Sequence, residues 1–414
     1  MSATQKLAVI GNGMAGIRTI EELLKIAPDK YEITVFGAEP HPNYNRILLS
    51  PVLAGEQTIK DIVLNDWDWY RDNGINLVTG KKITDIHRTR RELTADDGEK
   101  YSYDRLLIAT GSYPFILPIE GNKLPGVISY RDIADTEAMI DAAKRYKKAV
   151  VIGGGLLGLE AANGLKLRGM DVTVVHVMPW LMERQLDERA GKLLQASLEA
   201  KGIEFRMQAQ TEALVAGESG RVAALRFKGG EQIAADLVVM AVGIRPNTEL
   251  AAKSGLAVSQ RPGGILVTDT LQTLTDPRIY SVGECVNHRG MAYGLVAPLF
   301  EMAKVCANHL AEYGIGRYVG SVTSTKLKVT GIDLFSAGNF QGGEGTEDIV
   351  LSDPMGGVYK RLVIKDDKLV GACLYGDTVD GSWYFKLLRE GKTINEIRDH
   401  LMFGESNIGD VGHE

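Results

Sequence analysis

Short apolar runs alternate with longer amphipathic segments from the start of the chain. The run 8–10 ends at Gly11, and apolar residues then recur at helical spacing from 17 to 26. A second strand-like run, 32–36, follows after a polar break. This segment therefore predicts a βαβ unit and an α/β fold.

The glycines of the first turn have the spacing Gly-x-Gly-x-x-Gly. Gly11 permits the tight turn, Gly13 lets the backbone approach a pyrophosphate, and Gly16 lets the helix pack closely on the strand. The start of the helix, with Met14 and Ala15, attracts phosphate charge. These residues predict a dinucleotide site.

An acidic residue stands at the distance that such a site requires. Glu39 follows the second strand and lies 39 − 16 = 23 residues after Gly16, close to the roughly 20 expected for the acid that binds a ribose hydroxyl. Glycine turns between strand and helix also serve packing alone. The strand, helix and acid in register favour the dinucleotide.

The same pattern occurs a second time. The apolar run 149–152 meets another glycine turn, a helical segment covers 159–167, and a strand covers 172–175. The residues of this turn that would face a phosphate are Gly153, Gly155, Leu156, Leu157 and Gly158. Two units in one chain predict two dinucleotides, and a flavin with a nicotinamide is the natural pair because a hydride passes between them.

Each glycine unit is followed by an apolar strand that ends in glycine. The first ends in Ala109-Thr110-Gly111, and the second runs through 237–242 to Gly243. Each could be a plain strand end, but their matching placement favours paired crossovers between domains.

Three later features bear on the first dinucleotide. Gly283 and Glu284 end another apolar strand, where the carboxylate could hold a ribitol hydroxyl. Pro298 begins a helix that continues over 300–310; its positive end could stabilise a reduced flavin, or it could be a capped core helix. Arg46, in a turn-rich segment, could pair with a cofactor phosphate or be an ordinary surface arginine.

Composition narrows the function classes. Charged residues make up 24% and apolar residues 44% of the 414 positions, as in ordinary globular proteins. The net charge of −6 predicts neither a nucleic-acid nor an anionic-membrane partner. No apolar run approaches the roughly 20 residues of a membrane span, and no signal-peptide core opens the chain, so we expect a cytoplasmic location. Cys285, Cys306 and Cys373 are too dispersed for a disulfide framework or a metal cluster.

The character of the chain changes after residue 316, where short strand-like runs and two helical runs suggest a separate fold. The strand-like runs are 326–329, 334–337, 358–364 and 369–374, and the helical runs are 382–390 and 394–401. We expect two Rossmann-like dinucleotide-binding domains of glutathione-reductase type plus a C-terminal α+β domain. The predicted divisions are an FAD-binding domain (1–113 and 238–316), an NAD(H)-binding domain (114–237), the α+β domain (317–403) and a tail (404–414).

These motifs together resemble those of the FAD-dependent pyridine nucleotide-disulfide oxidoreductases over the full length. Within them, Tyr44-Asn45-Arg46, the run 176–187 and the run 324–329 are similar to the flavoprotein part of the NADH-dependent nitrite reductase large subunit. The resemblance implies that Arg46 and Lys326 contact FAD, that His176 and Gly243 contact NAD, and that Glu160 is catalytic beside the nicotinamide. It also allows a homodimer.

Several positions depart from the family pattern. Glu284 stands where Asp is common, and its extra methylene still lets it reach a hydroxyl. Pro51 replaces a Lys that ferredoxin-reductase relatives pair with a Glu, so Glu160 loses that partner. Residues 40–60 contain no cysteine, which excludes a dithiol relay, and the cysteines that ligate iron–sulfur and sirohaem groups are missing.

The expected function is therefore NADH oxidation through FAD with an external electron acceptor. The first expected partner is the iron–sulfur and sirohaem module of nitrite reductase, on another protein or domain. A rubredoxin or ferredoxin is the alternative, and an NADH-binding redox sensor is a further one. We expect NADH in preference to NADPH, because no Lys or Arg occurs from His176 to Trp180 to pair with a 2′-phosphate.

Overall fold

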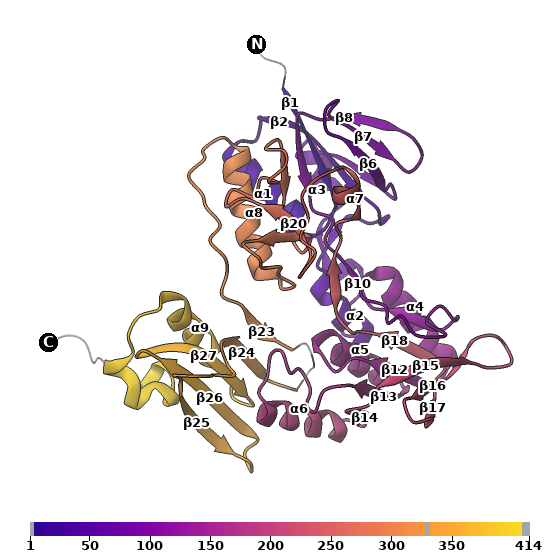
Figure 1. Cartoon of the computed structure of the whole chain (residues 1–414), viewed down its shortest axis with the longest axis vertical. Helices are drawn as coiled ribbons and strands as arrows, with labels where there is room; N and C mark the ends of the chain where they lie inside the picture. Colours follow the sequence, from indigo (N-terminus) through magenta and orange to yellow (C-terminus); the bar gives the residue numbers. More distant parts are fainter. Residues whose placement is uncertain (1–3, 328, 330, 408–414) are drawn as a thin grey trace. The chain divides into compact units, whose positions relative to one another are not determined.

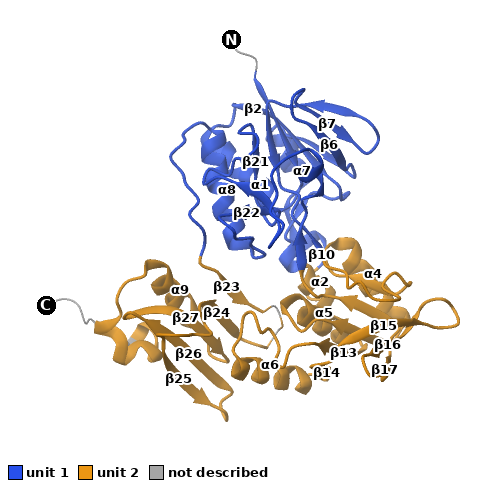
Figure 2. Cartoon of the chain, viewed as in Figure 1, with its two compact units in different colours: residues 1–48, 58–113, 244–321 blue, residues 49–57, 114–243, 322–414 orange. Residues whose placement is uncertain are grey.

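The computed structural model describes residues 4–327, 329 and 331–407, and these form two compact units (Figures 1 and 2). The first unit contains residues 1–48, 58–113 and 244–321, and the second contains 49–57, 114–243 and 322–414. The predicted partition into three domains differs in its cuts and stays a prediction.

The first unit is built on a parallel sheet of five strands. Their order is β21-β9-β1-β2-β5, with bounds β1 Gln5–Ile10, β2 Tyr31–Gly37, β5 Asn76–Thr79, β9 Arg105–Ile108 and β21 Ile279–Ser281. In chain order this is the 3-2-1-4-5 arrangement of doubly wound dinucleotide folds. Strands β2 and β5 are added on one side of β1, and β9 and β21 are added on the other side. The strand order thus reverses between β1 and β9, and the carboxyl ends of these two parallel strands are the expected ligand site.

Two helices, α1 (Met14–Ile26) and α8 (Val296–Leu310), pack side by side in this unit (Figure 1). Their apolar faces join the strands in one core, in which Val9, Ile20 and Met302 are fully buried. Burial of such side chains contributes about 1.5–3 kcal/mol each. The other elements of the unit are β3 Asn43–Tyr44, η1 Arg46–Leu48, η2 Lys60–Ile62, β4 Val63–Asn65, α3 Trp67–Asp72, β6 Ile83–His87, β7 Glu92–Ala95, β8 Lys100–Ser102, β10 Ser112–Pro114, β19 Ile244–Pro246, α7 Glu249–Lys253, β20 Ile265–Val267 and β22 Val286–His288.

The second unit contains another parallel sheet of five strands, in the order β11-β18-β12-β13-β14. Its strands are β11 Val127–Ser129, β12 Lys148–Ile152, β13 Asp171–His176, β14 Glu204–Met207 and β18 Leu237–Met240. The helices of this part are α2 Leu49–Ala54, α4 Ile133–Arg145, α5 Leu156–Leu167 and α6 Glu188–Ala200, and a three-stranded sheet follows as β15 Thr211–Ala216, β16 Val222–Phe227 and β17 Gln232–Ala234. The twice-used βαβ pattern predicted from the apolar runs is confirmed.

The chain after residue 322 forms an antiparallel sheet in the order β23-β24-β27-β26-β25. Its strands are β23 Ser324–Lys326, β24 Leu334–Gly338, β25 Glu347–Asp353, β26 Val358–Lys365 and β27 Lys368–Tyr375, and α9 Gly381–Glu390, η3 Asn395–Phe403 and η4 Glu405–Asn407 follow. Phe335, Leu362 and Tyr384 lie at the centre of its own apolar core. This arrangement confirms the predicted α+β character.

The elements differ from the predicted ones mainly at their ends. Helix α8 begins at Val296, two residues before Pro298, because proline is tolerated within a first helical turn. The run 394–401 is a 3₁₀-helix rather than an α-helix. Strand β23 ends at Lys326, and Lys328 of the predicted run, like most of the predicted tail, lies outside the described residues.

Among the described residues, every helix is too short or too polar to cross a membrane.

Candidate functional site

The first glycine turn lies where β1 ends and α1 begins, at the point where the strand order reverses. Gly11 has φ +115°, and a Cβ on it would lie 2.1 Å from the carbonyl oxygen of Ala109 in the neighbouring strand end. A Cβ on Gly16 would lie 2.8 Å from the carbonyl oxygen of Gly11. Protein packing alone therefore requires these two glycines.

Gly13 has a different reason to be glycine. It is the N-cap of α1 with extended backbone angles, φ −88° and ψ 179°, which any residue can adopt. Among the described residues, no atom lies within 4 Å of the place where its Cβ would be. The space is open, as expected where a ligand approaches the backbone.

The second turn repeats this geometry between β12 and α5. A Cβ on Gly153, at φ +119°, would lie 2.2 Å from the carbonyl oxygen of Ala241, and one on Gly158 would lie 2.0 Å from that of Gly153. At Gly155 nothing lies within 4 Å. In both turns, backbone atoms fill the space beside the first and third glycines, whereas the space beside the second glycine is open.

Both helices begin without an acidic residue in the first turn and without a side-chain cap. The first-turn N–H groups of a helix have no acceptor within the helix, and with the helix dipole they attract anions. The residues that carry these N–H groups are Met14, Ala15 and Gly16 in α1, and Leu156, Leu157 and Gly158 in α5.

The strand ends that follow each unit pair with each other. Strands β10 and β19 form a two-stranded sheet, the Thr110 hydroxyl donates to the Asn247 carbonyl at 2.8 Å, and the Asn247 N–H donates to the Gly111 carbonyl at 2.9 Å. The paired crossovers predicted from sequence are confirmed. Gly243, at φ +108°, again has open space around the position of a Cβ.

Glu284 lies at the same edge of the first unit as the Gly11 turn. A Cβ on Gly283 would lie 3.0 Å from that of Ala15, so this strand end reaches the first turn of α1. The Ser112 hydroxyl donates to Oε2 of Glu284 at 2.7 Å. The sequence did not single out Ser112, although it directly follows the Ala-Thr-Gly motif.

Arg46 and Glu39, which sequence reasoning treated separately, form an ion pair. Arg46 Nη2 lies 2.5 Å from Glu39 Oε1, and the Tyr44 hydroxyl donates to Glu39 Oε2 at 2.7 Å. The Arg46 guanidinium also stacks on the Tyr44 ring. Both members of the pair are partly exposed, so the proposed contacts of Glu39 with ribose and of Arg46 with a phosphate stay predictions.

Glu160 is buried in α5 and has a hydrogen-bond donor that the sequence did not suggest. The Ser50 hydroxyl in α2 donates to Glu160 Oε2 at 2.6 Å, and the Tyr130 hydroxyl donates to Ser50 at 3.3 Å. Ser50 directly precedes Pro51, the position that departs from the lysine expected from the family resemblance. That neighbouring position was the signal that could have found it.

His176 is the last residue of β13, and its ring is buried against the second turn. The Gly154 N–H donates to Nδ1 at 3.0 Å, and Nε2 lies 3.1 Å from Glu183 Oε2. Lys326 lies at the end of β23 in the second unit with an exposed side chain. Its predicted contact with FAD, like that of Pro298 in α8, stays a prediction.

Comparison with protein families decides the identity of this fold. Residues 5–305 match the pyridine nucleotide-disulphide oxidoreductase family, and residues 324–392 match the rubredoxin NAD⁺ reductase C-terminal domain. The chain belongs to the pyridine nucleotide-disulphide oxidoreductase family.

Two curated relatives come from Bacillus subtilis (strain 168). A nitrite reductase [NAD(P)H] is 53% identical over 95% of this chain and 48% of its own, and an assimilatory nitrate reductase electron transfer subunit is 48% identical over 97% and 52%. The chain thus spans about half the length of these relatives. Among solved structures, NADH:rubredoxin oxidoreductase from Clostridium acetobutylicum is 27% identical, with a TM-score of 0.79 over 96% of this chain and 99% of that one.

Members of this family bind FAD and NAD(P)H, and the residues of this chain fit both. Each turn has an open second glycine and a first helical turn without a side-chain cap. In the first unit, Glu284 also directly follows Gly283, which lies beside Ala15 in the first turn of α1. The predicted cofactors, FAD and a nicotinamide dinucleotide, are confirmed.

The cysteines of this family member are all buried. Burial raises the pKa of Cys373 to about 12 and raises the pKa of both Cys285 and Cys306. A thiol is nucleophilic and redox-active mainly as the thiolate, so burial suppresses that reactivity. Among the described residues, no cluster of three His, Cys, Asp or Glu side chains is arranged to hold a metal ion.

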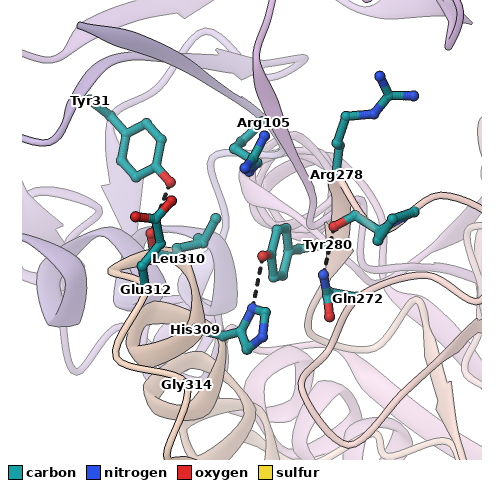
Figure 3. A pocket seen from close by; sticks show the side chains of 10 residues that line it. Tyr31, Arg105, Gln272, Arg278, Tyr280, His309, Leu310, Glu312 and Gly314 are labelled. Atoms are coloured by element: carbon teal, nitrogen blue, oxygen red, sulfur yellow. Dashed lines mark hydrogen bonds between the residues drawn. The ribbon is translucent and has the colours of Figure 1, made fainter. Parts of the chain in front are cut away.

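A cavity of about 390 Å³ opens elsewhere in the first unit, lined by Tyr31, Arg105, Tyr280 and His309 among others (Figure 3). Tyr31, Arg105 and the segment before Tyr280 stand where their strands begin, so the cavity lies at the amino edge of the sheet, opposite the glycine turn. The Tyr280 hydroxyl is 2.8 Å from His309 Nδ1. Burial, with Arg317 and Arg105 nearby, lowers the pKa of His309.

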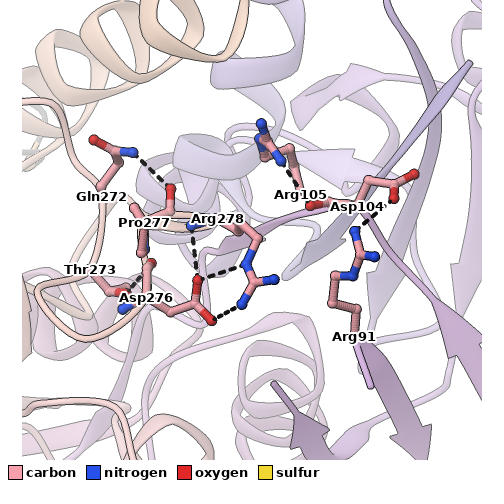
Figure 4. Close-up of polar contacts among 8 residues, drawn as sticks. All are labelled: Arg91, Asp104, Arg105, Gln272, Thr273, Asp276, Pro277 and Arg278. Atoms are coloured by element: carbon pink, nitrogen blue, oxygen red, sulfur yellow. Dashed lines mark hydrogen bonds and ion pairs between the residues drawn. The ribbon is translucent and has the colours of Figure 1, made fainter. Parts of the chain in front are cut away.

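Two charged side chains that line this cavity, Arg278 and Glu312, form ion pairs with residues beside it. Arg278 forms two hydrogen bonds of 3.1 Å with Asp276, and Arg91 pairs with Asp104 at 3.2 Å (Figure 4). None of the dinucleotide-binding residues predicted from sequence lines the cavity. Ligands of doubly wound sheets bind at the carboxyl edge, so the glycine turns are the candidate site.

Proposed function

We propose that this chain oxidises NADH through FAD and delivers the electrons to a metal centre outside it. The observation that carries the proposal is the pair of open second glycines, Gly13 and Gly155, in two turns whose other glycines are required by packing. Two dinucleotide cradles in one chain fit a donor and an acceptor of hydride. The names of the two Bacillus subtilis relatives support an electron-transfer role in nitrite or nitrate reduction.

The first unit holds FAD in this proposal. The N–H groups at the start of α1 bind its pyrophosphate, Glu39 a ribose hydroxyl, and Glu284, oriented by Ser112, the ribitol chain. The further residues assigned to FAD are Gly11, Gly13, Arg46, Ala109, Thr110, Gly111, Gly283, Pro298 and Lys326. Bound flavin supplies the hydride acceptor and can release electrons one at a time.

The second unit holds NADH. The first turn of α5 binds its pyrophosphate, with Gly153, Gly155 and Gly243 leaving room for the backbone to approach. Glu160 is assigned to the nicotinamide end, where Ser50 fixes the orientation of its carboxylate. The protein supplies proximity and orientation for hydride transfer rather than an acid–base pair.

The acceptor proposed first is the iron–sulfur and sirohaem module of an assimilatory nitrite reductase, on a partner protein or on another part of a longer chain. Reduction of nitrite to ammonium takes six electrons, which such metal centres can accumulate. The buried, protonated cysteines of this chain do not offer an internal relay. A homodimer is the proposed assembly of the flavoprotein.

A rubredoxin or ferredoxin is the second candidate acceptor. The observation that favours it is the match of residues 324–392 to the rubredoxin NAD⁺ reductase C-terminal domain.

Anaerobic turnover with each acceptor in parallel tests the proposal. The chain should oxidise NADH with ferricyanide, which takes electrons directly from flavin, and should form no ammonium from nitrite alone. Addition of the iron–sulfur and sirohaem module should restore NADH-dependent ammonium formation. The readouts are NADH consumed and ammonium formed.

The same experiment decides between the two acceptors. Rapid reduction of rubredoxin with no response to the nitrite reductase module would reject the first candidate in favour of the second. Absence of NADH oxidation with every acceptor, by protein that carries its full flavin, would reject the proposed function.

A further inference from the structure

The end of β13 lacks the carboxylate that NADH-specific sites usually carry. Such an acid accepts a hydrogen bond from the 2′-hydroxyl of the adenine ribose and repels a 2′-phosphate. His176 stands at this position, and its ring is 7% exposed. The group that contacts the 2′-hydroxyl of the ribose must then be another residue of this chain.

The ring of His176 fills space that the first unit fills differently. A Cβ on Gly154 would lie 2.7 Å from Cγ of His176, so the turn must be glycine beneath the ring. In the first unit the corresponding strand end is Gly37, and the side chain in the turn is Asn12, whose Cβ is 3.0 Å from a Cβ built on Gly37. In the first unit the side chain thus comes from the turn, whereas in the second unit it is the His176 ring at the strand end.

The hydrogen bonds define the tautomer of His176. The Gly154 N–H can only donate, so Nδ1 is the acceptor in that 3.0 Å bond. In the neutral ring the proton is therefore on Nε2, which donates to Glu183 Oε2 at 3.1 Å. Through these two hydrogen bonds, His176 connects the glycine turn to the carboxylate of Glu183, seven residues further along the chain.

The backbone holds Glu183 in the same place. The Met182 N–H donates to the Gly154 carbonyl at 2.9 Å, which ties the residue before Glu183 to the glycine turn. Gln341 Nε2 donates to the Glu183 carbonyl at 3.0 Å. Asp187, which caps α6, accepts from the Tyr359 hydroxyl at 2.6 Å. The α+β part of the chain thus supports this loop at two points.

We propose that Glu183 is the group that selects NADH, with His176 as its positioning residue. The carboxylate is 22% exposed, next to the turn that would hold the pyrophosphate, so a ribose hydroxyl can reach it. A 2′-phosphate at the same place would be repelled by the negative charge of the Glu183 carboxylate. Arg184 is adjacent and exposed, and its charge would favour the phosphate instead. The inference rests on the proposed use of NADH by this unit.

Binding of oxidised nucleotides to the flavin-loaded chain tests this without turnover. Calorimetry gives the dissociation constants of NAD⁺ and NADP⁺, and their ratio, NADP⁺ over NAD⁺, measures the preference. Glu183→Gln keeps the shape and removes the charge, so the ratio should fall at least tenfold. Arg184→Ala is the matched control and should not lower the ratio, because it removes a charge that would favour the phosphate.

His176 is tested as a positioning residue by its coupling to Glu183. His176→Ala should lower the ratio as Glu183→Gln does, and the double variant should lower it no further, because both changes remove one function. His176→Asp in the Glu183→Gln background should restore the preference, since it returns an acid to the strand end. Flavin content and circular dichroism check that each variant is folded.

The outcomes separate this inference from the proposed function. A ratio within twofold of wild type in folded Glu183→Gln overturns the inference, and so does a double variant in which His176→Ala lowers the ratio further than Glu183→Gln does. In both cases, tight NAD⁺ binding by the wild-type chain leaves the proposed function intact. A wild-type chain that binds neither nucleotide overturns both.

Discussion

The Ser50 hydroxyl donates a 2.6 Å hydrogen bond to Oε2 of Glu160, and both side chains are buried. A buried carboxylate needs such donors, because removal from water costs it its hydration. Ser50, which directly precedes Pro51, supplies one such donor, and its hydroxyl is neutral.

Ser50→Ala should therefore destabilise the protein. Loss of one donor to a buried carboxylate costs about 1–3 kcal/mol, measured as the free energy of unfolding in urea. Tyr130→Phe is the control, because it removes the longer 3.3 Å bond to Ser50 and leaves the Ser50 donor to Glu160 in place, and it should cost about half as much or less. Equal stability of Ser50→Ala and wild type would contradict the assignment.

Substitutions at the two open glycines should separate the two cofactors. Gly13→Leu should give folded, colourless protein, because its side chain enters the space assigned to the FAD pyrophosphate. Gly155→Leu should stay yellow and lose NADH binding. Each is the control for the other, since in the described part of the chain no atom lies within 4 Å of a Cβ at either position. Absorbance at the flavin band and NADH titration are the measurements, and full flavin in Gly13→Leu would disprove the first assignment.

Asp135, in the first turn of α4, should make stability depend on pH. Burial, with the nearby Asp132 carboxylate, raises the pKa of Asp135 to about 6 from its ordinary 3.8. The folded state therefore holds this proton more tightly than the unfolded chain, and the stabilisation is lost as pH rises from about 4 through 6.

Asp135→Asn removes this dependence. Relative to wild type, the variant should gain about 1–2 kcal/mol in free energy of unfolding between pH 4 and 7, a value reduced for screening by solvent. Asp141→Asn is the control: Lys144 lowers the pKa of that exposed carboxyl, so it should show no such gain. Parallel pH curves for wild type and Asp135→Asn would refute the prediction.

The buried cysteines should be dispensable for electron transfer. Replacing Cys285, Cys306 and Cys373 together with alanine should leave NADH-to-ferricyanide turnover within about threefold, because their raised pKa values keep them as thiols. Native protein should resist alkylation, whereas urea-unfolded protein should react at all three. A hundredfold loss of turnover with flavin still bound would show that a cysteine takes part.

Much of the fold could be read from local pattern. The two glycine turns and their strands are short-range features, because a turn that requires Gly11 or Gly153 is recognisable within a few residues of sequence. The ends of helices were predicted less accurately. Proline is tolerated anywhere in the first helical turn, so Pro298 did not reveal that α8 begins two residues earlier, at Val296.

The side-chain partners could not be read in this way, because they join residues far apart in the chain. Ser50 meets Glu160 across 110 positions, and Ser112 meets Glu284 across 172. Sequence patterns carry propensity and periodicity, whereas such pairs exist only once packing has brought two elements together.

The sequence by itself determined two βαβ units, their glycine turns and the pair of dinucleotides that they predict. Only the tertiary structure decided which glycines are required by packing and which leave open space, and that His176 turns its proton toward Glu183. The reason is physical: the clash of a Cβ with a neighbouring strand, like the direction of a hydrogen bond, depends on distances that no single segment contains.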